Sequence, residues 1–180
     1  MTLSLSWCGG LKSLMTLSMA QNMIKLTTIH ISECEKIEEV IQELGDEVKD
    51  DCIIFSQLEY LELGLLRSLK SFCLGNYTLE FSSLKYVSVD KCPSMKTFSQ
   101  GVLLTPKLHQ VYYYLDEDFE EVCWESNLNS TIQKMFKEMV RTYVLISSLI
   151  FLFCFFFLFF VVQVTITAPS MHICKRWMML

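Results

Sequence analysis

Two dense acidic stretches are the part of this sequence that comes nearest to a constellation for acid–base or metal chemistry. They lie at residues 33–51 and 116–121. Paired carboxylates can exchange protons in catalysis or coordinate calcium, but neither stretch has the Asp-x-Asp-x-Asp-Gly spacing of a calcium loop. Runs of like charge are most often solvated, so we expect exposed loops. Apolar residues at helical spacing from Ile37 to Leu44 predict a short helix inside the first stretch.

Eight cysteines and three histidines are the other candidates for metal or nucleophilic chemistry. The cysteines form no CxxC pair, and His30, His109 and His172 lie in no HExxH or comparable ligand spacing. No serine stands in a GxSxG nucleophile motif. We therefore predict no catalytic residue, no metal site and no cofactor, and we class the chain as not an enzyme. The net charge of −5 does not favour a nucleic-acid partner.

A repeated apolar pattern shows which elements must position these residues. Three units begin at Leu26, Leu58 and Leu84, and each has apolar side chains at offsets 3, 5, 8, 11 and 14 from that leucine. An incomplete unit precedes them, and a decaying unit follows Leu108. Offsets 0, 3 and 5 predict a short strand whose apolar side chains point inward, and offset 8 is where the chain leaves that strand. Because one unit cannot bury its apolar side alone, the units are expected to stack as a solenoid.

The repeat also gives a structural interpretation of two thiols. Cys34 and Cys92 both stand at offset 8, where leucine-rich repeats place Asn or Cys, and Leu66 takes that place in the unit between them. We expect these thiols to be small buried side chains that donate to carbonyls of the turn, rather than redox or metal ligands. The start of the chain has no basic segment before an apolar run, so a cytosolic protein with reduced thiols is expected.

The strand residues between the inward side chains are expected to face the concave surface of the solenoid. The tyrosines among them favour recognition, because tyrosine offers a large contact area at a small entropy cost. The alternative is cross-strand packing that only stiffens the sheet. The candidate protein-binding residues are Thr28, His30, Tyr60, Glu62, Tyr86, Ser88, Tyr112 and Tyr114.

The sequence resembles the terminal repeats of plant coiled-coil NLR disease-resistance proteins in three runs, LTTIHISECEKIEEVI, FSQLEYLELGLLRSLKSFC and FSSLKYVSVDKCPSMKTFSQGVLLTPKLHQV. The match is strongest at CPSMKTFSQGVLLTPKL, and it covers residues 1–140. The resemblance implies a protein-binding module that acts in the defence response, with a pathogen effector or other receptor domains as partners and a cytoplasmic location. No GxxxxGK[ST] phosphate loop occurs, so the nucleotide-binding domain of these receptors is missing from this sequence.

A helix is expected after the repeats. Asn129 or Ser130 is predicted to cap it, and its apolar side would cover the end of the solenoid. That apolar side consists of Ile132, Met135, Phe136, Met139 and Val140. The run WESNLNSTIQKMFKEMV resembles the short helix that closes such arrays.

The uncharged segment that follows has two interpretations. Residues 143–162 are twenty uncharged residues in a row, which is enough to cross a bilayer core of about 30 Å. Basic residues on both sides slightly favour repeats that face the cytosol. In that case the chain is a membrane-tethered adaptor or decoy. In the other interpretation the phenylalanine-rich run is a translated intron in a partial gene model, and hydropathy does not separate the two.

The predicted fold class is α/β, a short leucine-rich-repeat solenoid with a parallel sheet on its concave face, a capping helix and a C-terminal apolar helix. The predicted domains are the repeat array at 1–126, the capping helix at 127–141, a transmembrane helix at 143–164 and a short tail at 165–180. The predicted function is protein binding at the recognition end of a plant disease-resistance receptor. The alternative is the membrane-tethered adaptor or decoy.

Overall fold

The computed structural model describes residues 1–42, 52–116 and 119–167. These belong to two compact units, Met1–Glu138 and Met139–Leu180, and each is described by itself. The side chains of residues 114–121, 160 and 163–167 are not described. The first unit holds the repeats.

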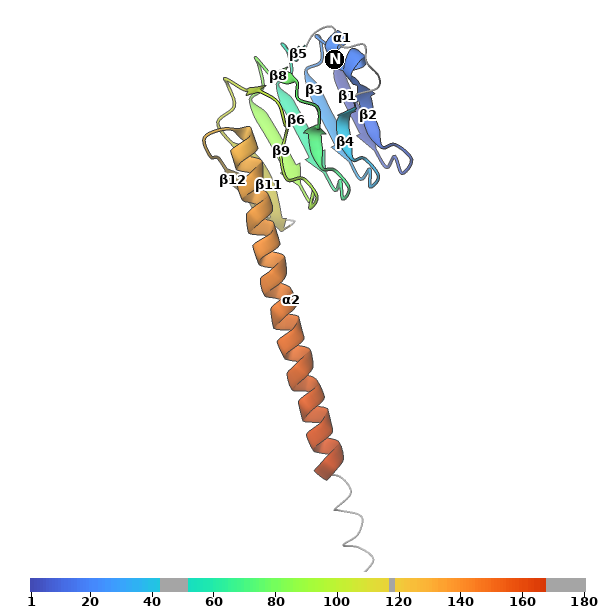
Figure 1. The fold of residues 1–180 in the computed structure, drawn as a ribbon, viewed down its shortest axis with the longest axis vertical. Coiled ribbons are helices and arrows are strands. Elements are labelled where there is room, and N and C mark those ends of the chain that lie inside the picture. Colours follow the sequence, from blue (N-terminus) through green and yellow to red (C-terminus); the bar gives the residue numbers. More distant parts are fainter. Residues whose placement is uncertain (43–51, 117–118, 168–180) are drawn as a thin grey trace, which may run out of the picture. The chain divides into compact units, whose positions relative to one another are not determined.

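A six-stranded main sheet forms the centre of the first unit (Figure 1). Its first five strands are parallel and follow the order of the chain, as predicted from the repeat. They are β1 (Thr2–Ser6), β3 (Thr28–Ser32), β6 (Tyr60–Gly64), β9 (Tyr86–Asp90) and β11 (Val111–Asp116). The sixth strand, β12 (Phe119–Cys123), pairs antiparallel with β11.

The inward side chains of the main sheet form two apolar ladders. Ile29, Leu61 and Val87 are partners in register and each is 0% exposed. The second ladder, at offset 5, is also buried, with Ile31 at 0%, Leu63 at 1% and Val89 at 7%. Complete burial of one such side chain stabilises the fold by about 1.5–3 kcal/mol. The predicted inward positions are therefore confirmed.

Two smaller parallel sheets and a short helix complete the turns of the solenoid. One sheet has the order β2 (Ser13–Thr16), β4 (Glu39–Gln42) and β7 (Ser71–Cys73). The other has the order β10 (Leu103–Leu104), β8 (Thr78–Glu80) and β5 (Cys52–Ile54). Helix α1 (Leu17–Asn22) follows β2, and the Thr16 hydroxyl caps it by accepting from the Met19 N–H at 3.3 Å.

The helix predicted around residues 37–44 is wrong for the part that the structure describes. Strand β4 occupies residues 39–42 of that segment, and residues 43–51 lie outside the described set. Val40 and Ile41 are both buried, at 0% and 1%, and β4 pairs with β2 on one edge and with β7 on the other. Pairing with neighbouring repeats thus overrides a short local periodicity that fits helix and strand equally well.

Four phenylalanines fill the space between the sheets. Phe72 stacks on Phe98 with ring centroids 4.8 Å apart, and Phe55 stacks on Phe81 at 5.2 Å. The two stacks meet edge to face, for example between Phe72 and Phe81 at 5.8 Å. All four rings are 0% exposed. The four rings form one aromatic cluster that joins the units beginning at Leu58 and Leu84.

The turn after each main-sheet strand repeats the same backbone geometry. The residue at offset 7 has a positive φ in four units, at 62° for Trp7, 54° for Glu33, 55° for Leu65 and 49° for Lys91. The left-handed region costs a non-glycine residue about 1–2 kcal/mol, so the stacked turns must hold it in place. A recurrent strained turn of this kind marks the offset-7 position as part of the repeat itself.

The two thiols at offset 8 stabilise these turns. The Cys34 thiol donates to the Ser32 carbonyl at 3.2 Å, and the Cys92 thiol donates to the Asp90 carbonyl at 3.2 Å. Burial raises the pKa of Cys34, and it raises the pKa of Cys92 to about 12. Both thiols therefore remain protonated at neutral pH, which is the state needed to donate. The structural interpretation of these cysteines is confirmed.

The C-terminal end of the stack is closed by the β11–β12 hairpin and by the beginning of α2 (Leu128–Thr167). Leu128 and Ile132 of α2 are 0% and 2% exposed within the core of the repeats. The acidic stretch at residues 116–121 was predicted as a loop, but β12 begins at Phe119. Residues 117–118 lie outside the described set.

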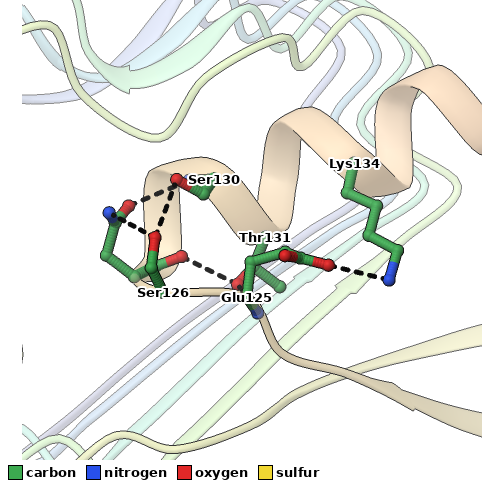
Figure 2. A network of polar contacts seen from close by, with 6 residues as sticks. Glu125, Ser126, Ser130, Thr131 and Lys134 are labelled. Carbon is green, nitrogen blue, oxygen red and sulfur yellow. Dashed lines mark hydrogen bonds and ion pairs between the residues drawn. The ribbon is translucent and has the colours of Figure 1, made fainter.

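The cap of α2 differs from the prediction. Asn127, rather than Asn129 or Ser130, accepts the Ser130 N–H at 2.9 Å. Figure 2 shows the polar network beside it, in which the Glu125 N–H donates to the Thr131 hydroxyl at 3.0 Å. Lys134 also pairs with Glu125 at 2.8 Å. These contacts fix the chain as it passes from β12 into the helix.

Asn129 has a different role, because its side-chain amide binds the last turn of the repeats. Its Oδ1 accepts the N–H groups of Phe98 and Ser99, each at 3.0 Å, and the Thr97 hydroxyl at 3.1 Å. Its Nδ2 donates to the Ser99 carbonyl at 3.0 Å. One side chain thus satisfies four polar groups of residues 97–99.

Helix α2 is a single element of 40 residues and includes both segments that were predicted as separate helices. Within the second unit, the described side chains from Tyr143 to Phe159 lie on the surface all round the helix. The exposed fraction of Phe153 is 74%, for example. By length and composition, α2 holds a stretch able to cross a membrane.

Candidate protein-binding face

The parallel register brings the predicted site residues together on one side of the main sheet, which we call the concave face. One row across the strands consists of Thr28, Tyr60 and Tyr86. The next row consists of His30, Glu62, Ser88 and Tyr112. Seven of the predicted residues therefore occupy adjacent positions on four strands. Tyr114 lies in β11, and its side chain is outside the described part of the chain.

Three tyrosines form a continuous strip on the concave face. Tyr86 stacks on Tyr112 with centroids 4.6 Å apart and an interplanar angle of 22°. Tyr60 lies 6.1 Å from Tyr86 at an angle of 41°. Tyr60 is 46% exposed, and the other two are half-buried. Cross-strand packing and an accessible aromatic surface thus occur together, and Tyr60 offers the largest free ring area of the three.

A polar pair continues the second row toward the N-terminal strands. His30 Nδ1 and Glu62 Oε2 are 2.8 Å apart, and their side chains are 39% and 43% exposed. At that exposure the pair contributes little to stability. It does hold the imidazole and the carboxylate in fixed positions beside Tyr60 and Tyr86.

The remaining predicted residues are less accessible. Ser88 is 7% exposed because it lies between Glu62 and Tyr112 in the register, so it offers little surface to a partner. Thr28 is half-buried beside Tyr60. Of the candidates, Tyr60 is exposed, and the side chains of His30 and Glu62 are 39% and 43% exposed.

Some residues of this face were not among the candidates. Lys85 pairs with Glu59 at 3.2 Å immediately before β9 and β6 begin. The hydroxyls of Ser6 and Ser32 are 2.8 Å apart on β1 and β3. Gln110 donates to the Tyr112 hydroxyl. In the first two pairs both residues have the same offset in neighbouring units, so comparison of the repeats would have found them.

Within the described residues, no group of three or more His, Cys, Asp or Glu side chains could hold a metal ion. Charged groups of the concave face form two pairs among the described residues, His30 with Glu62 and Lys85 with Glu59. The concave face thus combines an aromatic strip with paired charges beside it.

Comparison with known proteins assigns the repeats to a family. The model of the family described as "Plant disease resistance protein RPS2-like, leucine-rich repeats" matches residues 1–102, which is more than half of the chain. The chain belongs to this family. The RPS2-like match includes every main-sheet strand from β1 to β9, and with them all the candidate residues except Tyr112 and Tyr114.

One curated relative is Disease resistance protein SUMM2 of Arabidopsis thaliana. It is 28% identical over 127 residues, which cover 69% of this chain and 14% of the relative. The chain thus spans a small part of that protein's length. No solved structure matches the chain. The RPS2-like repeats identify a defence-related leucine-rich-repeat module, a fold that typically serves as a scaffold for protein interactions.

Proposed function

We propose that the RPS2-like repeats bind a protein partner through the concave face, as the recognition part of a plant disease-resistance receptor. The partner is a pathogen effector or another receptor domain, and the binding occurs in the cytoplasm. The chain contributes recognition rather than nucleotide switching or catalysis. The observation that carries the proposal is the strip of Tyr60, Tyr86 and Tyr112 next to the His30–Glu62 pair.

Two physical arguments support this role for the strip. Tyrosine is enriched at positions that contribute most to binding, because its ring buries a large area and loses few rotamers. The strands beneath the strip are held by fully buried ladders, so Tyr60 and Tyr86 are already ordered before a partner arrives. Ordering costs at the interface are correspondingly small.

The test is a quantitative affinity measurement of the full chain against purified effector proteins and purified domains of disease-resistance receptors. For a partner that binds, Tyr60→Ala and Tyr86→Ala are each expected to weaken binding by about tenfold or more. Lys70→Ala is the matched control, because Lys70 forms an exposed pair with Glu38 at the other end of the repeat turn. Partners that respond to Lys70→Ala but not to the tyrosine variants would contradict the proposal.

A second candidate function is attachment to a membrane through residues 143–164, with the repeats in the cytosol. A specific observation favours it. The segment carries apolar side chains on all sides, and the hydroxyls of Ser147 and Ser148 both donate to the Val144 carbonyl, at 2.9 and 2.8 Å. Polar groups satisfied inside the helix can enter hydrocarbon at low cost. Insertion of the surrounding Leu, Ile, Phe and Val residues is favourable by about 0.3–0.6 kcal/mol each.

This attachment is tested by flotation of the full chain with phosphatidylcholine vesicles. We expect the chain to float with the vesicles and to stay with them after carbonate extraction. A chain that remains in the soluble fraction without detergent, as a monomer, would contradict the attachment and leave the proposal for the concave face untouched.

A further inference from the structure

The Glu62 carboxylate on β6 has one oxygen engaged and one open. Its Oε2 lies 2.8 Å from His30 Nδ1, and its side chain is 43% exposed. Across the part of the chain that the structure describes, His30 is the one polar partner of this carboxylate. The Oε1 atom can therefore accept a hydrogen bond from a partner protein without loss of a contact within the sheet.

Small side chains lie next to Glu62 on two sides. Ser88 is its register partner on β9, and Gly64 follows it by two residues on β6, so both share its face of the sheet. Among the described residues, a Cβ added at Gly64 would meet only the Cβ of Ser32, at 3.9 Å, which is an ordinary van der Waals contact. A bulky group therefore has room to lie against the sheet beside the Glu62 carboxylate.

An aromatic ring lies on the other side of Glu62 along β6. Tyr60 precedes Glu62 by two residues, so its side chain leaves the same face of the sheet about 7 Å away along the strand. The ring is 46% exposed and is tilted by 41° from the ring of Tyr86. The face of an aromatic ring attracts a cation that lies within about 6 Å of its centroid. One cationic side chain can thus contact the Tyr60 ring and the Glu62 carboxylate together.

The charge of the concave face also favours a cation. Along the concave-facing positions of β3, β6 and β9, the charged side chains are Glu62 and Asp90, with histidine counted as neutral. Asp90 is the register partner of Gly64, so both carboxylates border the same part of the sheet. The basic residue that precedes β9, Lys85, is already paired with Glu59 at 3.2 Å. This part of the face is therefore complementary to a positive group.

We propose that the concave face binds an arginine side chain of its protein partner. The guanidinium lies over the ring of Tyr60 and donates to the Glu62 carboxylate, with its free edge above Gly64. Arginine fits better than lysine, because a planar guanidinium can stack on a ring and donate two parallel hydrogen bonds to one carboxylate. The inference rests on the proposed binding of a protein through this face, and it adds the chemistry that the partner must present.

The test measures binding of the peptide acetyl-Gly-Ser-Arg-Ser-Gly-amide to the full chain in a non-ionic detergent, with fluorotyrosine in place of tyrosine. Fluorine magnetic resonance follows the signal of Tyr60, which is assigned with the variant Tyr60→Phe. We expect a saturable shift of this signal with a Kd of about 1 mM. The same peptide with citrulline in place of arginine has a neutral side chain of the same shape. It is the matched probe, and it is expected to bind about fivefold more weakly or less.

A pair of variants tests the role of the carboxylate. Glu62→Gln keeps the shape and a hydrogen-bond acceptor beside His30 but removes the charge, so it is expected to weaken binding of the arginine peptide by about fivefold. Glu38→Gln is the matched control, because Glu38 pairs with Lys70 outside the main sheet, and it is expected to leave binding unchanged. Thermal unfolding of both variants checks that the repeats remain folded.

Three results would overturn the proposal: equal binding of the arginine and citrulline peptides, no shift of the Tyr60 signal, or full binding by a folded Glu62→Gln chain. The comparison of the two peptides uses the unchanged chain, so it decides the proposal even where a variant is unstable.

The failure of this inference can be told apart from the failure of the proposed function. A protein partner that responds to Tyr60→Ala but not to Glu62→Gln would support binding through the concave face and overturn the arginine site. Arginine-specific peptide binding that requires Glu62, with no effector or receptor domain that responds to Tyr60→Ala, would support the arginine site and contradict the proposed function.

Discussion

The repeat core and the distal part of α2 are both rich in large apolar residues, yet they present them to opposite surroundings. In the repeats, Leu61 and Phe72 recur at fixed offsets and are 0% exposed. In α2, Phe151 and Phe153 are 72% and 74% exposed. Spacing, rather than apolar content, thus decides which segments build a protein core. A run without such spacing has no polar side to turn to water.

The largest difference between the two regions is expected when a charged residue is placed in each of them. Leu61→Asp is expected to unfold the repeats, because an unpaired buried carboxylate costs several kcal/mol against a total stability of about 5–15 kcal/mol. Leu152→Asp, at a position that is 51% exposed, is expected to leave thermal unfolding of the repeats unchanged. Circular dichroism of both variants measures the difference, and similar melting curves would show that the inward assignment is mistaken.

A smaller effect is expected where α2 meets the repeats. Asn129→Ala removes four hydrogen bonds to Thr97–Ser99 and is expected to cost about 2–3 kcal/mol. Asn127→Ala removes the helix cap and is expected to cost about 1 kcal/mol. Denaturant titration gives both values. If the cap variant were the more destabilising of the two, the contact with the last repeat would not be what closes the array.

Removal of the distal part of α2 tests whether this segment contributes to the stability of the repeats. A chain that ends after Val140 keeps Leu128, Asn129 and Ile132, so the stability of its repeats is expected to change by less than about 0.5 kcal/mol. It is also expected to lose flotation with vesicles. A truncated chain that fails to fold would mean that the apolar segment belongs to the core.

The smallest effect is expected at the concave face. Glu62→Ala removes a partner of His30 at positions about 40% exposed, so it should change stability by less than about 0.5 kcal/mol. The same measurement of the free energy of unfolding checks this value. A large loss would indicate that the His30–Glu62 pair supports the sheet, and that it is not merely part of a contact surface.

Much of the fold could be predicted because the repeat fixes its own register. Once Leu26, Leu58 and Leu84 are aligned, the partners in the main sheet follow, and so do the rows of the concave face. The protonated donor role of Cys34 and Cys92 followed from the same alignment. These features recur in several units, so a single sequence contains several independent observations of each.

The errors occurred where a feature is present only once or depends on a distant partner. Strand β4 has apolar residues that also fit a helix, and only its position between β2 and β7 decides. Strand β12 begins inside an acidic stretch that disfavours strands, and pairing with β11 overrides that preference. The prediction placed the cap at Asn129 or Ser130 instead of Asn127, because the partners that engage Asn129 lie about thirty residues earlier in the chain.

The position of Asn129 also sets the order of events during synthesis. The first units leave the ribosome early and can stack on one another at once, since each needs only its neighbour. The last unit stays unfinished until Asn129 and Leu128 arrive to complete it. At about 5–20 residues per second, the nascent chain therefore spends seconds with an unprotected apolar end. The apolar part of α2 leaves the ribosome only after the residues that complete the last repeat.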